Sequence, residues 1–141
     1  MKILIDTNVL LDYVLCREPF FKSSADVLHF CVDNGTERAM AAHSILNMWF
    51  ILRKLMPEDD RRNTLIDLSK AISVIPVDYV KIYNALIRKE FKDFEDCVQE
   101  ECAVSFGADY IITRNVQDFT ASRIPALTPE DFLNKCGGIT S

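Results

Sequence analysis

The first hydrophobic run of the chain ends abruptly on an acid. Ile3, Leu4 and Ile5 are followed directly by Asp6. A short run of aliphatic residues predicts a strand that is buried on both faces, as strands of parallel sheets are. Asp6 then lies at the carboxyl end of this strand, the edge where open α/β sheets bind their ligands. A carboxylate there is costly to bury without a partner, and a divalent cation is a common partner. A plainer role is also open, because Asp6 can cap a helix that begins near Val9.

Short apolar runs alternate with helical periods along the rest of the chain. We expect strands at 3–5, 38–42, 72–75, 109–112 and 125–129, and helices at 8–15, 20–33, 45–54, 57–70, 77–89, 93–106 and 129–135. The helix at 45–54 is so apolar that we expect it to be buried on most sides. Alternation of strands and helices predicts a three-layer α/β/α fold with a mostly parallel central sheet of four to five strands. The expected domain is 1–136, and 137–141 is expected to be a flexible tail.

Composition limits the classes of function. The net charge of −5 and the pI of about 5.0 exclude a protein that coats nucleic acid by charge alone. Five cysteines without a Cys-x-x-Cys pair indicate buried free thiols in a reducing cytoplasm rather than zinc or disulfides. No apolar stretch approaches the roughly 20 residues of a membrane span, and we expect no signal peptide.

Further polar side chains are expected at the same edge of the sheet as Asp6. Asn115 and Asp118 follow the strand at 109–112, although Asp118 can equally be a turn residue. Asp93 and Asp96 open the preceding helix. We expect its start to reach this edge only if it stacks as a hairpin on the helix at 77–89. Asp93 is better explained as the cap of its helix, and the remaining acids of that helix are expected to form a solvated face: Glu95, Glu100 and Glu101.

Taken together, several segments resemble a PIN domain, the small α/β nuclease fold best known from VapC-type toxins of bacterial toxin–antitoxin systems. The resemblance extends from Ile3 to Phe132. It is carried by Asp6-Thr-Asn-Val-Leu-Leu-Asp12, Asp93-Phe-Glu-Asp96, Gly107-Ala-Asp-Tyr-Ile-Ile-Thr-Arg-Asn115, Asp118-Phe119 and Leu127-Thr-Pro-Glu-Asp-Phe132, in this order and spacing.

The resemblance implies a metal-dependent endoribonuclease that hydrolyses RNA with Mg²⁺ or Mn²⁺. Asp6 matches the first acid, Asp96 the third, and Asn115 or Asp118 the fourth. The expected catalytic residues are therefore Asp6, Asp96 and Asp118, with Asn115 as a further metal ligand. Residues expected to line the site are Asn47, Ser44, Thr113 and Asp93, and the candidate phosphate contacts are Arg114 and Arg17, with Lys22 and Arg53 as further candidates.

The resemblance also implies partners. An antitoxin is expected to cover the site, and a homodimer is expected because family members often form one. Phe20, Phe21, Trp49 and Phe50 are candidates for the partner surface, although ordinary core packing is the expectation for them.

Two amides depart from the family pattern. Asn47 stands where relatives carry a Glu, and Asn115 where many carry an Asp. An amide offers a cation a neutral oxygen but no charge, so a single weakly held metal fits better than a two-metal clamp. A competing hypothesis is a degenerate PIN domain that binds RNA or protein without cutting. A phosphotransfer enzyme with Asp6 as its nucleophile is disfavoured, because the second acid that it needs is Asn8 here.

Overall fold

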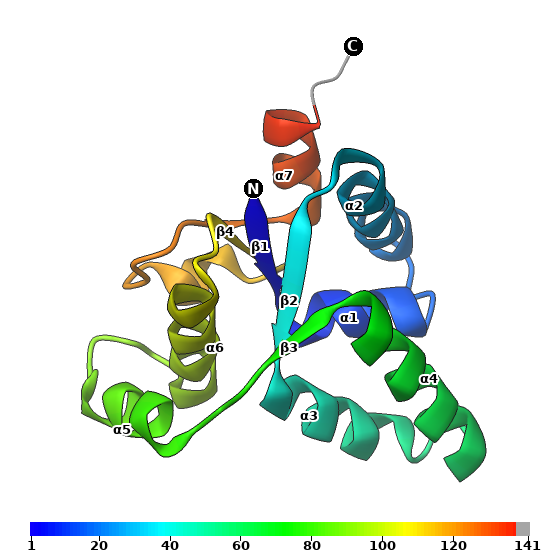
Figure 1. Ribbon diagram of the computed structural model, residues 1–141, viewed down its shortest axis with the longest axis horizontal. Helices are drawn as coiled ribbons and strands as arrows, with labels where there is room; N and C mark the ends of the chain where they lie inside the picture. Colours follow the sequence, from blue (N-terminus) through cyan, green and yellow to red (C-terminus); the bar gives the residue numbers. More distant parts are fainter. Residues whose placement is uncertain (138–141) are drawn as a thin grey trace.

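A parallel sheet of five strands forms the centre of the computed structural model, which describes residues 1–137. The strands are β1 (Lys2–Ile5), β2 (Glu37–Ala41), β3 (Ser73–Ile75), β4 (Tyr110–Ile112) and β5 (Ala126–Leu127). Their spatial order is β3-β2-β1-β4-β5, and all four neighbouring pairs are parallel. β1 lies in the middle, so the first strand of the sequence is the most enclosed (Figure 1). The predicted three-layer α/β fold is confirmed.

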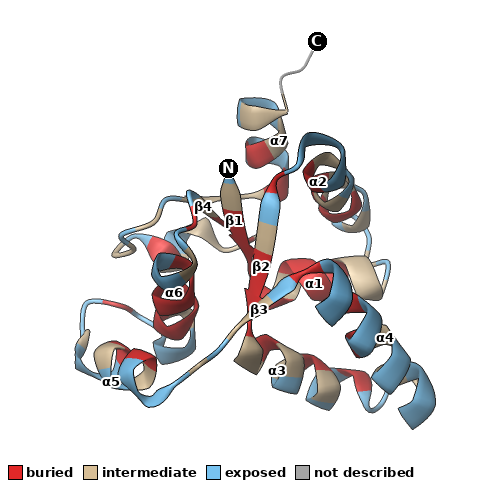
Figure 2. Cartoon of the chain, viewed as in Figure 1, coloured by how far each residue is buried: buried red, intermediate tan, exposed pale blue. Residues whose placement is uncertain are grey.

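Alternate residues of the strands pack on opposite faces of the sheet. Ile3 and Ile5 belong to a core with residues of α1, α2, α3, α4 and α7, whereas Leu4 belongs to a second core with residues of α5 and α6. The inner strands β1, β2 and β4 are buried over most of their length, and so is the middle of α6, whereas the edge strands β3 and β5 are half-buried or exposed (Figure 2). Helices cover both faces of the sheet, which is why the strand sequences are continuous apolar runs and do not alternate between apolar and polar residues.

The helices carry local signals at their ends. They are α1 (Thr7–Val14), α2 (Phe21–Asn34), α3 (Ala42–Leu52), α4 (Glu58–Ala71), α5 (Tyr79–Ile87), α6 (Phe94–Phe106) and α7 (Pro129–Cys136), with a short 3₁₀ helix at Val116–Phe119. α2 and α6 end at Gly35 and Gly107, whose φ angles of 63° and 77° favour glycine. Asp93 accepts a hydrogen bond from the backbone of Asp96, so its predicted role as a cap is confirmed.

The prediction that the helix at 45–54 is buried on most sides is wrong. α3 buries one stripe at a spacing of four residues, Ser44, Met48 and Leu52. Leu46 and Phe50 are 71% and 62% exposed. Phe20 is also exposed, at 37%, so core packing is wrong for Phe20 and Phe50. A helix at the rim of the sheet touches the core along one side only, whatever its composition.

The acids of α6 also differ from the sequence prediction. Glu100 and Glu101 are buried, not solvated, and they pair with Arg88 and Arg123. Arg123 binds Glu100 with both its backbone and its side chain, at 2.6 and 2.8 Å. The two arginines come from segments on either side of α6 in the sequence, so only the tertiary structure brings them together.

The remaining expectations concern the thiols and the tail. The cysteines are free, and Cys31, Cys97 and Cys102 are buried, whereas Cys16 is exposed. Of the predicted tail at 137–141, only Gly137 belongs to the described residues. None of the helices in residues 1–137 is long and apolar enough to cross a membrane.

Candidate active site

Asp6 lies where β1 and β4 end side by side. The register pairs Ile5 with Ile112, and the backbone N–H of Asp6 donates to the carbonyl of Ile112 at 2.9 Å. The Asp6 side chain accepts from Thr113 Oγ1 and from the backbone N–H of Thr7, each at 2.8 Å. It therefore caps α1, which begins at Thr7. Asp6 can therefore cap the helix and also lie at the edge of the sheet, because one carboxylate oxygen makes the cap and the other accepts from Thr113.

The first turn of α6 lies at this same edge of the sheet. The condition that α5 and α6 must form a hairpin for this to happen is wrong. α6 precedes β4 and runs antiparallel to it, and such a helix begins at the level where the strand ends (Figure 1). Asp96 therefore reaches the site of Asp6 by simple helix–strand geometry.

A pocket of about 330 Å³ opens between the carboxyl edge of the sheet, α3 and α6. Three carboxylates line it, those of Asp6, Asp96 and Glu95. The other lining residues are Thr7, Asn8, Asn47, Phe50, Ile51 and Asn115. The structure thus brings four of the predicted residues to one pocket: Asp6, Asp96, Asn47 and Asn115.

A buried polar network lies beside the pocket. Thr7 Oγ1 and Ser44 Oγ are 2.7 Å apart, and Gln99 Nε2 donates to both, at 3.2 and 3.1 Å. The network joins α1, α3 and α6 and fixes their relative positions. Gln99 was missed by sequence reasoning. A polar residue three positions after Asp96, and so on the same face of the helix, is the signal that could have found it.

Negative charge is concentrated at the pocket. Burial raises the pKa of Asp96 to about 7, and the charges of Asp6, Asp93, Asp118 and Glu95 add to this shift. The pKa of Asp6 is also raised by burial, although the hydrogen bonds from Thr113 and Thr7 oppose the shift. Carboxylates that resist ionisation in this way favour a cationic ligand.

Comparison with known proteins gives the family of this chain. A family model described as PIN domain matches residues 2–117. The chain belongs to the PIN domain family. No curated protein matches it. The solved structures that it resembles include a toxin–antitoxin complex from Klebsiella pneumoniae, with a TM-score of 0.68, 22% identity and coverage of 90% of this chain and 97% of that one.

Two further structures resemble this PIN domain. VapBC2 from Rickettsia felis, bound to a promoter DNA fragment, has a TM-score of 0.70 at 13% identity and covers 91% of this chain and 98% of that one. VapC20 from Mycobacterium tuberculosis, a toxin that cleaves the sarcin–ricin loop, has a TM-score of 0.62 at 15% identity and covers 77% and 86%. At these identities the likeness shows the shared fold.

The donor set of this PIN domain suits a hard divalent cation. The pocket offers carboxylate and amide oxygens and no thiol. Within residues 1–137, no three His, Cys, Asp or Glu side chains are grouped closely enough to hold an ion by themselves. A cation here would therefore complete its shell with amide oxygens or water, which is how Mg²⁺ is commonly bound.

The other predicted site residues lie at different depths. Ser44 and Thr113 are fully buried and act on the site through hydrogen bonds. Asp93 is exposed at the start of α6. Asp118 is half-buried in the 3₁₀ helix, and its charge raises the pKa of Asp96, but in the described chain it is not part of the pocket lining.

The candidate phosphate contacts are partly engaged already. Arg114 Nε lies 2.8 Å from Oδ2 of the fully buried Asp12, and Arg17 Nε lies 3.8 Å from Oδ1. The Arg114 guanidinium is also 4.1 Å from the centre of the Phe20 ring. Arg114 and Arg17 share the single negative charge of Asp12, so a net positive charge remains near Asp6. The charge of Arg114 acts to lower the pKa of Asp6. Lys22 pairs with Asp26, and Arg53 stacks on Phe50 at 3.8 Å.

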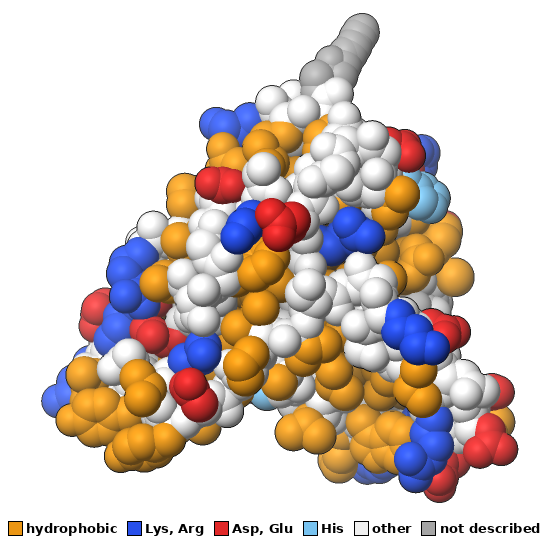
Figure 3. Space-filling view, viewed as in Figure 1, with side chains coloured by type: hydrophobic (Ala, Val, Ile, Leu, Met, Phe, Trp, Pro, Cys, Tyr) orange, Lys and Arg blue, Asp and Glu red, His pale blue; other side chains and the backbone are white. Residues whose placement is uncertain are grey.

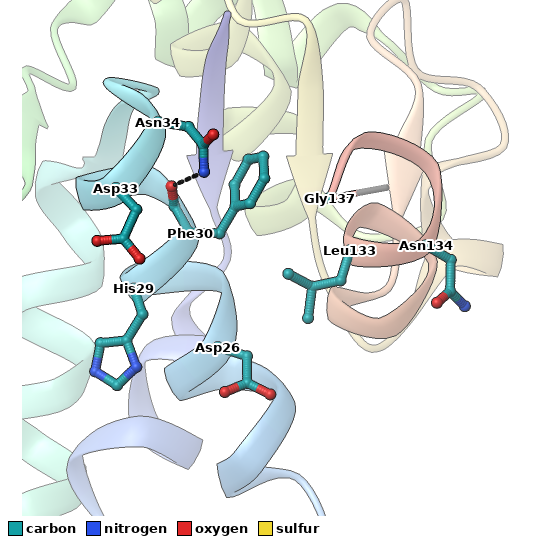
Figure 4. A pocket seen from close by; sticks show the side chains of 8 residues that line it. All are labelled: Asp26, His29, Phe30, Asp33, Asn34, Leu133, Asn134 and Gly137. Carbon is teal, nitrogen blue, oxygen red and sulfur yellow. Dashed lines mark hydrogen bonds between the residues drawn. The ribbon is translucent and has the colours of Figure 1, made fainter. Parts of the chain in front are cut away.

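A larger and more open pocket, of about 620 Å³, lies elsewhere on this PIN domain. Figure 4 shows it between α2 and α7, with Asp26, His29 and Asp33 along one helix and Leu133 and Asn134 on the other. The side chain of Asn34 donates to the carbonyl of Phe30, and this bond lies within α2. It contains none of the predicted site residues, so volume does not identify the functional site here.

Proposed function

We propose that this PIN domain is a metal-dependent endoribonuclease that hydrolyses RNA phosphodiester bonds and acts as the toxin of a toxin–antitoxin pair. The observation that carries the proposal is the shared pocket of Asp6 and Asp96, where burial and neighbouring acids raise the pKa of Asp96 to about 7. Two carboxylates in such surroundings are stabilised in their ionised form by a bound cation. The family and the likeness to solved VapC structures support the reaction class.

In this proposal Asp6 and Asp96 hold Mg²⁺ or Mn²⁺, Asn115 adds an amide oxygen, and Asp118 acts through water. When bound, the cation supplies positive charge that promotes the ionisation of water and offsets charge on the transition state. Thr113 orients Asp6 through its hydrogen bond, which also opposes the rise in the pKa of Asp6 that burial causes. Arg114, Arg17 and Arg53 supply positive charge for the RNA backbone.

RNA cleavage tests this directly. The protein is incubated with structured and unstructured RNA in Mg²⁺, in Mn²⁺ and in EDTA, beside the Asp6→Asn and Asp96→Asn variants. We expect cleavage with either metal, none in EDTA, and a loss of at least a hundredfold in both variants. Equal trace cleavage by wild type and Asp6→Asn would show contamination and refute the proposal.

The second candidate function is an RNA- or protein-binding module without catalysis. It is favoured by the two amides, Asn47 and Asn115, and because no three His, Cys, Asp or Glu side chains of residues 1–137 are placed to hold an ion together. It predicts RNA binding that EDTA leaves unchanged, with no cleavage under any metal. Calorimetric Mn²⁺ binding with a dissociation constant below about a millimolar would count against it.

We propose an antitoxin as the protein partner, as in the VapBC complexes that the fold resembles. An apolar groove of about 610 Å³ between α1, α2 and α4 supports this, with Tyr13, Phe21, Leu28, Val32 and Leu68 among its lining. Co-purification with the product of a small neighbouring gene is expected, and Val32→Asp, at a 65% exposed position, should abolish it. Retention of the partner by this variant would exclude the groove.

We also propose a homodimer and a cytoplasmic location. Exposed apolar side chains gather over α5 at the lower left of Figure 3, and they include Val80, Tyr83, Leu86 and Ile87. Light scattering should give twice the monomer mass, and Leu86→Glu should give the monomer. A wild-type monomer at all concentrations would refute the dimer. The free cysteines suit a reducing cytoplasm.

A further inference from the structure

Arg114 lies between two residues of the candidate active site. The residue before it, Thr113, donates a hydrogen bond to Asp6, and the residue after it, Asn115, lines the pocket. The Arg114 guanidinium itself contacts a different group, the carboxylate of Asp12 on α1. Its charge still acts on Asp6 and lowers the pKa of that residue, so the guanidinium lies within electrostatic reach of the pocket.

A buried carboxylate holds one edge of this guanidinium. Arg114 Nε lies 2.8 Å from Asp12 Oδ2, and Arg114 Nη2 donates to Asp12 Oδ1 at 3.3 Å. The Asp12 side chain is fully buried, whereas that of Arg114 is 26% exposed. A guanidinium carries its five N–H donors in one plane, so the end at Nη1 points away from Asp12. Within residues 1–137, Nη1 takes part in no hydrogen bond or ion pair.

An aromatic ring covers one face of the same guanidinium. The guanidinium carbon of Arg114 lies 4.1 Å from the centre of the Phe20 ring, a distance at which a ring attracts a cation. The turn that carries Phe20 is tied to Asp12 by its backbone. The N–H of Arg17 donates to the carbonyl of Asp12 at 3.0 Å, and the N–H of Phe20 donates to the carbonyl of Arg17 at 2.9 Å. Asp12 therefore helps to place both the edge contact and the face contact.

Neutralising Asp12 does not account for the whole cluster. Arg17 Nε lies 3.8 Å from Asp12 Oδ1, so a second cation faces the same carboxylate. One carboxylate carries a single negative charge, and the cluster of Asp12, Arg17 and Arg114 is therefore positive. A guanidinium that is held on one edge and on one face, with another edge open, has the geometry that receives a phosphate through two parallel hydrogen bonds.

We infer that Asp12 and Phe20 are positioning residues that orient Arg114 as a bidentate ligand for an RNA phosphate beside the pocket. The inference rests on the proposed function and deepens it, because it gives Arg114 a fixed geometry as well as a charge. A side chain that is already ordered loses little conformational freedom when it binds, which strengthens the contact. A lysine could supply the charge at this position but not the planar pair of donors.

The test is the binding of a short, fluorescently labelled, unstructured RNA in EDTA over a range of salt concentrations. Arg114→Lys keeps the charge and removes the fork. We expect it to weaken binding by about fivefold or more while the slope of log affinity against log salt stays the same. Arg114→Gln removes the charge as well and should reduce that slope by about 0.7. Arg62→Lys is the matched control, because Arg62 is an exposed arginine that pairs with Glu58 along α4, and it should change affinity by less than about twofold.

Phe20→Leu tests the positioning role. It keeps an apolar side chain and removes the ring, and we expect RNA binding to weaken by about threefold. Combined with Arg114→Gln it should cause no further loss, because it acts through Arg114. Losses that simply add in the double variant would overturn this role. Asp12→Asn is expected to lower stability, so Phe20→Leu is the variant that decides, and unchanged unfolding temperatures show that it is folded.

The outcomes separate this inference from the proposed function. If Arg114→Lys binds RNA as wild type does, charge alone is sufficient, and the inference is wrong while the proposed nuclease stands. If Arg114→Gln also binds as wild type does, Arg114 serves only to neutralise Asp12, which again overturns the inference alone. If wild type binds no RNA in EDTA or in Mg²⁺ and cleaves none, both the proposed function and the inference fail.

Discussion

The hydroxyl of Thr113 donates a hydrogen bond of 2.8 Å to Oδ2 of Asp6, and this bond joins the carboxyl ends of β4 and β1. The same hydroxyl oxygen accepts from the backbone N–H of Asn115 at 3.1 Å. One buried side chain thereby fixes the first acid of the pocket and the start of the segment that carries Asn115. The geometry of the site thus depends on the register of two neighbouring parallel strands.

Thr113→Val should remove this bond while preserving the shape of the side chain. We expect a loss of about 1–2 kcal/mol in the free energy of unfolding, because a buried carboxylate oxygen loses its donor. The pKa of Asp6 should rise, since the Thr113 bond lowers it, and Mn²⁺ binding at neutral pH should weaken. Urea unfolding measures the loss of stability, and calorimetry measures the weakening of Mn²⁺ binding. Thr120→Val, at an exposed position, is the control. Equal behaviour of the two variants would contradict the role of the bond.

Asp96 should make the metal-free protein less stable as the pH rises. Its pKa of about 7 in the folded state lies above the ordinary value of 3.8, so between these values the folded state holds a proton that the unfolded chain has lost. Asp96→Asn removes this cost. We expect this variant to raise the unfolding temperature in EDTA by about 5 °C near pH 8. This figure is smaller than the full pKa shift would give, because solvent screens the charge of a half-buried group. Near pH 4 wild type and Asp96→Asn should unfold at the same temperature. A higher unfolding temperature of the variant at that pH would contradict the raised pKa of Asp96.

The ion pairs of Asp12 predict a large effect away from the pocket. Asp12→Asn leaves Arg114 and Arg17 without their anion, and we expect a loss of about 2–4 kcal/mol in chemical unfolding. Asp26→Asn is the comparison, because it breaks the exposed pair with Lys22 along α2 and should change stability little. Comparable losses from the two variants would show that burial does not decide the strength of these pairs.

Glu100 predicts the opposite pH dependence to Asp96. Burial alone would raise the pKa of Glu100, but the hydrogen bonds from Arg123 and Arg88 outweigh it and lower the pKa below 4.5. Its stabilisation is therefore present above about pH 4.5 and is lost as the pH falls through the lowered value. Glu100→Gln should cost about 3 kcal/mol near pH 7 and less in acid. Glu90→Gln, which alters an exposed contact of the same Arg88, should have little effect. A cost for Glu100→Gln that did not depend on pH would rule out this explanation.

Local patterns were sufficient for the elements of the fold. The apolar run at Ile3–Ile5 and Asp93 as the cap of α6 are both signals within a few residues, and each prediction is confirmed. Exposure was predicted less well. The apolar composition of α3 indicated burial, yet Leu46 and Phe50 are exposed, because composition does not say how many neighbours a helix has.

The sequence by itself determined that Asp6 ends a buried strand, that Asn115 follows another strand, and that the chain has the motifs of a PIN domain. These depend on local periodicity and on the rule that parallel strands end at one edge. Only the tertiary structure decided what surrounds Asp6. Glu95 reaches the pocket because Asn47 holds it from another helix, and Glu100 is buried because two arginines from separate segments meet it. Such pairings depend on how helices rotate and pack across the sheet, and no local pattern carries that information.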